Sequence, residues 1–476
     1  MSFFSDNSFY LILQIIYIIT VIGVVIVVIS ENRNPVKTLA WVLVLLLIPV
    51  GGLVIYYFFG EDHRKKRLIS RKMHKKLNRN SLYSIDRLET LHVPNHYKRL
   101  VNLLNRTNAA PLYGNNELEF YSSAESMFAS LFEEIRKAEK FIHIQFFIFM
   151  DDSIGQELGE LLVKKAQQGV EVRLMYDDVG SWKAKNKFFR QLEKRGVKVG
   201  AFLKVKLPVL TSRVNYRNHR KVVVIDGEVG FMGGMNVADR YLKGINGGIW
   251  RDCHFKVVGK AVYGLETSFA IDWYSITKEF LSSSKYFPDF ESKGENIMQI
   301  VTSGPTGEYK EIHQGIFHAI MNATEYVYIQ TPYFIPTDNL MLALQTAALS
   351  GVEVRIMLPA KADTVFVHIA TLSFIKDLLK AKVKVDFYEK GFLHSKLLVI
   401  DDSLAIVGSA NMDVRSFEHN FEIEAFMYDS EAAKKVKDIY FNDLSESKEM
   451  TFDEWLKRPW YKRFASSVLR LFTPLL

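Results

Sequence analysis

Two long apolar runs stand at the start of the chain and predict helices that cross a membrane. Residues 9–30, FYLILQIIYIITVIGVVIVVIS, and residues 38–59, TLAWVLVLLLIPVGGLVIYYFF, carry no charged side chain. Each run has about the 20 residues that a helix needs to span a bilayer. Pro49, Gly51 and Gly52 lie in the second run and are tolerated better in a membrane helix than in a soluble one. The pattern therefore predicts a membrane hairpin over residues 1–60, with two buried helices of a soluble protein as the alternative.

The charges beside these runs predict how the hairpin is oriented. The connecting loop, residues 31–37, holds two Lys/Arg, whereas residues 61–80 hold nine Lys/Arg and two Asp/Glu. Because basic segments stay on the cytoplasmic side, we expect a multi-pass protein of the cytoplasmic membrane with its body in the cytoplasm. Residues 61–112 are then a basic juxtamembrane linker that lies against anionic headgroups.

The distribution of charge disfavours a nucleic-acid partner, and the cysteine count excludes disulfide-linked and cysteine-rich metal sites. The formal net charge is +8, and residues 61–80 account for +7 of it. The rest of the chain is nearly neutral, which disfavours a nucleic-acid partner, because such proteins spread basic residues over a binding face. The single cysteine, Cys253, excludes an intramolecular disulfide framework and a cysteine-rich metal site.

The body of the chain is an internal repeat. SLFEEIRKAEKFIHIQFFIF at 130–149 matches GIFHAIMNATEYVYIQTPYF at 315–334, and LLVKKAQQGVEVRLMYD at 161–177 matches LQTAALSGVEVRIMLPA at 344–360. Each copy alternates an amphipathic helix with an apolar, β-branched strand, which predicts an α/β fold with helices on both faces of its sheets. We expect two such domains, residues 113–288 and 289–450, joined through the polar stretch before residue 296.

The C-terminal segment, residues 451–476, mixes aromatic and basic side chains. Trp455, Trp460 and Tyr461 alternate with lysines and arginines before an apolar end. This composition is too charged for a span and favours an amphipathic helix at the membrane interface. A helix packed on the body is the alternative.

A second repeated pattern carries the chemistry. NHRKVVVIDGEVGFMGGMN at 218–236 and LHSKLLVIDDSLAIVGSANMD at 393–413 each give H-x-K-x-x-x-x-D, a glycine-led turn and an asparagine. Two copies at matching places of a duplicated domain make chance implausible. The polar members are His219, Lys221, Asp226 and Asn236 in the first copy, and His394, Lys396, Asp401 and Asn411 in the second.

Strand periodicity divides these residues by face. Side chains two apart share a face of a strand, so each histidine points with its lysine, whereas the aspartate seven residues on points away and braces the turn. A carboxylate must orient each imidazole. We expect Asp252 to serve His219 and Glu422 to serve His394, each acid within its own half; a surface or salt-bridge role is the alternative.

Brought together by pseudo-two-fold symmetry, the two copies suit phosphoryl chemistry. The lysines (Lys221, Lys396) and asparagines (Asn236, Asn411) supply charge and amide donors for phosphate oxygens. One histidine can attack phosphorus, while the other protonates the leaving group and then deprotonates the incoming nucleophile. No metal and no cofactor is expected.

The paired motifs resemble those of the phospholipase D superfamily and, within it, the bacterial cardiolipin synthases. The resemblance covers nearly the whole chain, including RNPVKTLAWVLVLLLIPVGG, YDDVGS, NYRNHRK, GGMNVADRY, WRDCHF, VTSGP and GSANMDVRSF. It implies two pseudo-symmetric phospholipase D-like α/β/α sandwich domains behind the transmembrane hairpin. It also implies that two phosphatidylglycerol molecules give cardiolipin and glycerol through a phosphatidyl-histidine. By the same analogy His219 is the nucleophile and His394 the acid and base, although symmetry allows the reverse.

Other functions stay open at this point. Water in place of the second lipid would make the protein a hydrolase that releases phosphatidic acid. The superfamily also includes phosphodiesterases that cleave nucleic acid, which the membrane runs and the neutral body disfavour. A membrane scaffold with an inactive site is a third reading, and the intact motifs argue against it. Phosphatidylglycerol and other anionic lipids are the expected partners, and the oligomeric state, a homo-oligomer included, is left open.

Overall fold

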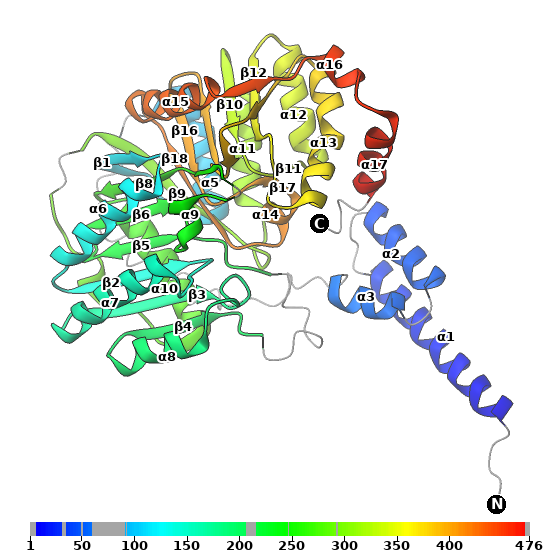
Figure 1. Ribbon diagram of the computed structural model, residues 1–476, viewed down its shortest axis with the longest axis horizontal. Coiled ribbons are helices and arrows are strands. Elements are labelled where there is room, and N and C mark those ends of the chain that lie inside the picture. The colour runs from blue at the N-terminus through cyan, green and yellow to red at the C-terminus, as the bar shows by residue number, and fades with distance from the viewer. Residues whose placement is uncertain are drawn as a thin grey trace, which may run out of the picture. The chain divides into compact units, whose positions relative to one another are not determined.

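The N-terminal helices form a compact unit of their own. The computed structural model describes residues 6–30, 35–48, 51–59, 91, 93–205, 216–245, 247–291 and 294–471. In this unit α1 spans Asp6–Ser30, α2 spans Pro35–Leu47 and α3 spans Gly51–Phe59 (Figure 1). Val21 and Val28 of α1 pack with Trp41 and Leu45 of α2, and the Tyr17 hydroxyl donates to the Leu45 carbonyl at 3.3 Å.

Among the described residues, α1 is the helix that is long and apolar enough to cross a membrane, over Tyr10–Ser30. The second predicted span is divided instead between α2 and α3, each shorter than the ~20 residues that a crossing helix needs. Residues 49–50, which lie between α2 and α3, are outside the described residues. One apolar helix is therefore present, and a two-span hairpin stays a prediction.

The body is built on one continuous sheet of 15 strands. The first half contributes β1 (Tyr113–Tyr121), β2 (Phe141–Phe146), β3 (Glu171–Asp177), β4 (Lys198–Phe202), β5 (Val222–Ile225), β6 (Val229–Gly233) and β8 (His254–Val258). The second half contributes β9 (Asn296–Ser303), β10 (Tyr326–Gln330), β12 (Glu353–Pro359), β13 (Lys384–Tyr388), β15 (Leu397–Ile400), β16 (Leu404–Gly408), β18 (Glu422–Met427) and β19 (Ser447–Glu449).

The two halves share the sheet because their first strands pair with each other. Strand β1 lies antiparallel to β8 on one side and to β9 on the other. From this junction the first half runs β1-β8-β6-β5-β2-β3-β4, and the second runs β9-β18-β16-β15-β10-β12-β13. Corresponding strands therefore occur in the same order in both halves. The pairing of β1 with β9 therefore joins the two halves in one sheet.

Helices cover both faces of the sheet, in agreement with the continuous burial of central strands such as β2, β5, β15 and β18. In β5, Val222 and Val224 pack into a core shared by both halves, whereas Val223 and Ile225 pack into a core made mainly by the first half, to which Phe392 of the second half also belongs. Helices α10 (Val262–Thr277) and α15 (Ser430–Leu444) cover the shared face (Figure 1). The opposite face is covered by α6 (Ala124–Lys137), α7 (Ser153–Gln167), α8 (Asn186–Lys194), α5 (Lys98–Asn108), α11 (Glu311–Met321), α12 (Asp338–Leu349) and α13 (Val365–Lys380).

Short elements complete the body. They are α9 (Asp239–Lys243), α14 (Val414–Glu418), α16 (Phe452–Leu456), α17 (Trp460–Leu471), a two-stranded pair of β7 (Ile249–Arg251) with β14 (Gly391–Leu393), and a second pair of β11 (Phe334–Ile335) with β17 (Met412–Asp413).

Helix α5 lies inside the segment that the sequence assigned to a linker. Its amphipathic pattern places Leu100 and Leu104 in the core of the second half, beside α11 and β9. The basic residues 61–80 of the predicted linker lie outside the described residues.

Candidate active site

Each repeated motif occupies a hairpin at the middle of its half-sheet. His219 and Lys221 come directly before β5, which turns into β6; His394 and Lys396 come directly before β15, which turns into β16. Asp226 has a backbone φ of 54° at the turn. This left-handed conformation is one that aspartate accepts more readily than most residues do.

Asp226 and Asp401 stabilise the backbone at the turn of each motif and do not contact its histidine. The Asp226 carboxylate accepts backbone N–H groups of Glu139, Lys140 and Phe141 at 2.7–2.8 Å. Asp401 does the same for the N–H groups of Thr324, Glu325 and Tyr326 at 2.7–2.9 Å. Each aspartate lies at the far end of its strand from the histidine, roughly 20 Å away along an extended chain. Both therefore brace the strand, as their odd spacing indicated.

The backbone beside each histidine is hydrogen-bonded to the other half. The N–H of His219 donates to the Phe421 carbonyl at 2.9 Å, and the N–H of Phe421 donates to the Arg217 carbonyl at 2.8 Å. In the second motif, β14 runs parallel to β7, and the N–H of His394 donates to the Arg251 carbonyl at 2.6 Å. Each histidine is thereby placed beside the residue that precedes the other half's acid.

The two acids consequently serve the opposite histidines. Nδ1 of His219 lies 3.1 Å from Glu422 Oε2 and 3.0 Å from the Ser409 carbonyl. Nδ1 of His394 lies 2.6 Å from Asp252 Oδ2. All four side chains are buried. The predicted pairing within each half is therefore wrong, because the hydrogen bonds between the halves bring each acid to the other motif.

Two buried lysines lie beside the imidazoles. Lys221 Nζ donates to the His219 carbonyl at 2.5 Å. Lys396 Nζ donates to the His394 carbonyl and lies 2.9 Å from His394 Nδ1. Burial and the neighbouring ammonium lower the pKa of Lys221 to about 7, and burial lowers the pKa of Lys396 to about 8.

The charges of the two motifs act on one another. Burial lowers the pKa of His219, and both lysines lower it further while Glu422 raises it. Burial lowers the pKa of His394 well below its usual value, and Lys396, Lys221 and His219 add to that effect. Since each lysine affects both imidazoles, the two motifs meet in one electrostatic environment. In it the histidines are neutral near pH 7, and Glu422, whose pKa is lowered, is ionised.

Comparisons with known proteins identify the family of this chain. The family model described as "Cardiolipin synthase, PLD-like domain" matches residues 131–248 and 316–444, and the model described as "Phospholipase_D-nuclease N-terminal" matches residues 15–61. The chain belongs to the PLD-like cardiolipin synthase family. It is 41% identical to the major cardiolipin synthase ClsA of Bacillus subtilis (strain 168), over 98% of this chain and 99% of that one. It is 39% identical to the cardiolipin synthase of Oceanobacillus iheyensis, with the same coverage.

A solved structure shares the fold at low sequence identity. The phosphatidylserine synthase of Haemophilus influenzae Rd KW20 is 15% identical and aligns with a TM-score of 0.61. The alignment covers 80% of this chain and all of that one. The two-half body is therefore a fold that this family shares with another enzyme named as a phospholipid synthase.

The two asparagines of this cardiolipin synthase family member are not equivalent. Asn236 is occupied within the protein: its Nδ2 donates to the Tyr241 hydroxyl at 2.6 Å, and its Oδ1 accepts the Ile148 N–H at 2.9 Å. Asn411 Oδ1 is buried and has no hydrogen-bond partner among the described residues. A phosphate-binding role stays a prediction for both; it needs the donor Nδ2, which in Asn236 already donates to Tyr241.

Sequence reasoning missed several neighbours of the family's motif residues. Glu424 follows Glu422 by two residues, the spacing that places both on one face of β18, and it accepts the Ala410 N–H at 2.7 Å. Burial raises its pKa well above the usual value, which keeps it neutral. The position that corresponds to Glu424 in β8 holds His254, whose pKa burial lowers to about 3. Phe147, whose ring lies 4.9 Å from that of His219, had no recognisable signal.

Proposed function

We propose that this protein is a cardiolipin synthase that transfers a phosphatidyl group from one phosphatidylglycerol to another and releases glycerol. The observation that carries the proposal is the crossed pairing: His219 with Glu422, and His394 with Asp252. This pairing gathers two imidazoles, two carboxylates and two lysines into one buried environment from residues far apart in the chain. Family membership and about 40% identity to named cardiolipin synthases support the reaction.

A pseudo-two-fold relation between the halves explains the crossing. The strand order is the same outward from the β1–β9 junction in both halves. A two-fold axis through that junction would exchange the two motifs, so each contact from one half has a counterpart from the other. His219 with Glu422 and His394 with Asp252 are counterparts of this kind.

His219 is suited to the nucleophilic role. Its Nδ1 faces two acceptors, Glu422 and the Ser409 carbonyl. A proton on Nδ1 leaves the lone pair on Nε2, the form that can attack phosphorus. The lowered pKa of His219 keeps the imidazole neutral and nucleophilic near pH 7.

His394 then supplies the acid and the base. Burial and the lysines hold its pKa low in the free protein, but a bound phosphodiester adds negative charge beside it and raises that pKa. Nε2 of His219 bonds to phosphorus as the bond to the glycerol oxygen breaks, and His394 gives its proton to that oxygen. His394 next takes the proton of the second lipid's headgroup hydroxyl. That oxygen bonds to phosphorus, and the bond to His219 breaks.

Lys221 and Lys396 supply positive charge to the phosphate. Among the described residues, neither lysine forms an ion pair with a carboxylate. Their ammonium groups contact backbone carbonyls of the motif, so they can turn to phosphate oxygens without breaking a buried ion pair. Asn411 lies two residues after Ser409, and the donor Nδ2 of its amide is the second candidate contact to the phosphate.

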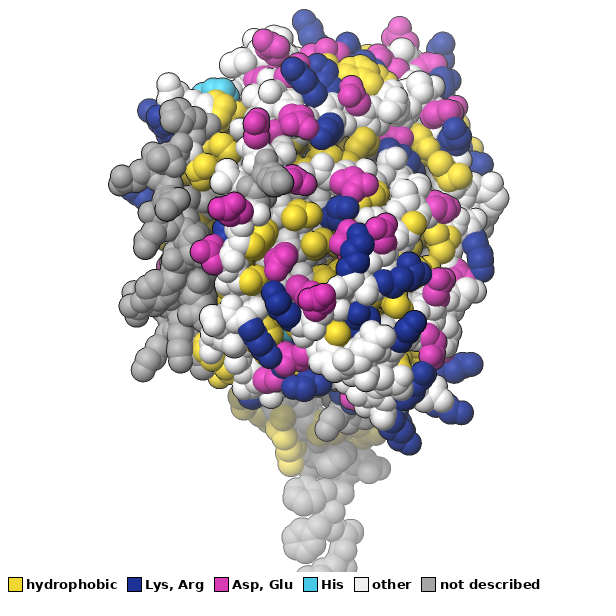
Figure 2. Space-filling model, turned by 90° about the vertical axis from the view of Figure 1, so that its left-hand side faces the viewer, with side chains coloured by type: hydrophobic (Ala, Val, Ile, Leu, Met, Phe, Trp, Pro, Cys, Tyr) yellow, Lys and Arg dark blue, Asp and Glu magenta, His cyan; other side chains and the backbone are white. Residues whose placement is uncertain are grey.

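The membrane features suit lipid substrates. Helix α1 is apolar over Tyr10–Ser30, and a second span with the body on the cytoplasmic side is part of the proposal. On the face drawn in Figure 2, acidic and basic side chains are interspersed and no broad basic patch is present. That distribution supports lipid rather than nucleic acid as the partner.

The test is conversion of labelled phosphatidylglycerol by the purified full chain in mixed micelles. Cardiolipin and free glycerol in equal amounts are the expected products. Trapping by acid quench, followed by mass spectrometry, is expected to find a phosphatidyl group on the peptide that contains His219. A product dominated by phosphatidic acid would make the protein a hydrolase and overturn the synthase proposal.

A further inference from the structure

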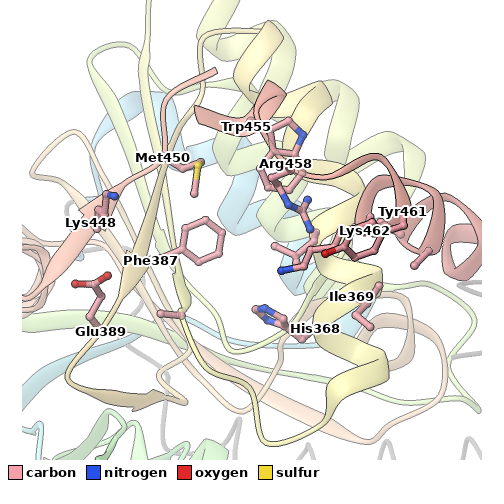
Figure 3. Close-up of a pocket in the computed structure, with 14 residues that line it drawn as sticks. His368, Ile369, Phe387, Glu389, Lys448, Met450, Trp455, Arg458, Tyr461 and Lys462 are labelled. Atoms are coloured by element: carbon pink, nitrogen blue, oxygen red, sulfur yellow. The ribbon is translucent and has the colours of Figure 1, made fainter. Parts of the chain in front are cut away.

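A cavity of about 600 Å³ lies in the second half, and none of its lining residues belongs to the paired motifs. It opens between α13, β13 and the C-terminal helices α16 and α17 (Figure 3). Its volume is in the range of roughly 300–1,000 Å³ that small-molecule sites have. The cavity is thus large enough for a ligand that the catalytic centre does not use.

The interior of the cavity is apolar. Leu372 and Ile369 of α13 face Phe387 of β13, and Met450 and Trp455 close the wall. Figure 3 shows Phe387 and Met450 on the side opposite α13 and α17. Such a lining binds hydrocarbon and gives no hydrogen bonds to a small polar solute.

Basic side chains lie at one side of this apolar space. Figure 3 shows Arg458, Lys462 and His368 reaching toward one another at the side formed by α13 and α17. Arg458 stacks over Trp455 at 4.0 Å, yet its Nη1 is buried without a hydrogen-bond partner among the described residues. A buried guanidinium nitrogen with no acceptor costs free energy that an anionic ligand would recover.

The pKa shifts of the basic residues beside the cavity also indicate that they have too little negative charge around them. Burial and the charge of Arg463 lower the pKa of Arg458, and burial and the charge of Arg458 lower the pKa of His368. Glu389 also lines the cavity, but Lys448, Arg458 and Lys462 outnumber it. The site therefore favours an anion over a cation.

The outer surface beside the cavity is suited to a bilayer. Helix α17 is fixed to α13 by Arg470, whose Nη1 donates to Asp377 at 2.9 Å. One face of α17 lines the cavity, while Trp460, Phe464 and Leu471 on another face are 64–77% exposed. Val365 and Phe366, at the start of α13, are similarly exposed. Exposed aromatic and aliphatic residues next to basic ones are typical of a surface that enters the membrane interface.

We infer that this cavity binds a phospholipid with an anionic headgroup, its phosphate on Arg458 and Lys462 and an acyl chain against Leu372, Phe387 and Met450. The bound lipid is separate from the lipids that react at the paired histidines. It joins the C-terminal helices to the membrane and orders them against α13. The inference goes beyond the proposed reaction and does not depend on turnover.

Photolabelling tests this inference on the full chain in detergent micelles. The probe is phosphatidic acid with a diazirine on one acyl chain, and the same chain on phosphatidylcholine is the comparison. A His219→Ala background removes turnover, so a failure of the proposed reaction cannot alter the result. We expect the anionic probe to label peptides from 365–372 and 450–466 at least tenfold more than phosphatidylcholine does.

Two variants and one matched control locate the contact. Arg458→Gln removes the unpartnered guanidinium, and Lys462→Gln removes an exposed cation whose loss should not disturb folding. Each is expected to lower labelling about tenfold or more, the effect of a lost charge-assisted hydrogen bond. Lys457→Gln, on the same segment but outside the cavity, is expected to leave labelling unchanged.

Three results would overturn the inference. The first is equal labelling by the anionic and zwitterionic probes. The second is labelling that stays unchanged in both Arg458→Gln and Lys462→Gln. The third is complete loss of labelling in excess inorganic phosphate, which would identify a site for a soluble anion in place of a lipid.

Discussion

The crossed pairing of acids and histidines makes a prediction that separates it from pairing within each half. Consider a phosphatidyl donor whose leaving group is p-nitrophenol, which departs without a proton from the protein. Only the nucleophile and its orienting acid are then needed for the first step. If His219 attacks and Glu422 orients it, His219→Ala loses the burst of nitrophenolate and Glu422→Gln slows it, whereas His394→Ala and Asp252→Asn keep it at its full rate.

The contacts of each imidazole set the size of these effects. In Glu422→Gln, the Ser409 carbonyl at 3.0 Å still accepts the Nδ1–H of His219, so the tautomer survives and the charge is lost. A hydrogen bond to a charged group is worth about 1.5–3 kcal/mol, so the burst rate should fall about 10- to 150-fold. For His394, Asp252 is the acceptor at Nδ1, and the other contact, Lys396, is a donor. With phosphatidylglycerol as donor, Asp252→Asn should therefore cost more, up to about 10⁴-fold, as loss of the correct tautomer does in serine proteases.

The assay is rapid-quench or stopped-flow detection of nitrophenolate. The enzyme concentration is high enough for the burst amplitude to exceed the background release of nitrophenolate. The reasoning is refuted if Asp252→Asn abolishes the burst together with His219→Ala while Glu422→Gln retains it, because the acids would then act within their own halves. If His394→Ala and Asp252→Asn lose the burst together, the pairing stands and the nucleophile is His394. The smaller effect of Glu422→Gln and the larger effect of Asp252→Asn test the contacts of the two imidazoles, whichever histidine is the nucleophile.

Three further predictions follow from the same contacts. The apparent KM for phosphatidylglycerol should rise from about pH 7 to pH 9, because Lys221 and Lys396, with pKa values of about 7 and 8, lose the charge that holds phosphate; a flat KM across this range would contradict it. The free energy of unfolding should increase over the same range, because the unfolded lysines still bind protons that the folded ones have lost, and Lys221→Met should reduce that slope in thermal melts at several pH values. Asp226→Asn should destabilise the chain by about 2 kcal/mol or more through weakened bonds to Glu139, Lys140 and Phe141, with kcat per folded molecule retained; a large fall in kcat at unchanged Tm would instead place Asp226 in the chemistry.

Local patterns were sufficient for the strands and motifs but not for their partners. The β-branched runs at 222–225 and 397–400 form the predicted buried strands, and the odd spacing placed Asp226 and Asp401 away from the histidines. The bonding of Asn236 to Tyr241 was not predictable, because it depends on where α9 folds back. The break between α2 and α3 was underestimated, although Pro49 marked its position.

Non-local pairing accounts for the main error. Asp252 follows β7, and β7 pairs with β14 from the other half, a contact between residues more than a hundred positions apart. Sequence spacing within one repeat does not reveal such a contact, so an acid of the same half seemed the natural partner. The pairing of β1 with β9 is likewise non-local, since an edge strand does not reveal in its own sequence which edge it will meet.

Because each histidine is paired with an acid of the other half, activity requires both halves to be folded together. Neither motif is complete in its own half, because His219 needs the acceptors Glu422 and Ser409, and His394 needs Asp252. Buried carboxylates and imidazoles without these partners would carry an uncompensated desolvation cost. The site can therefore form only when the β1–β9 junction and the two inter-half segments are in place. Reactive histidines are thus assembled in the same step that buries them from water, which favours transfer to a lipid hydroxyl over hydrolysis.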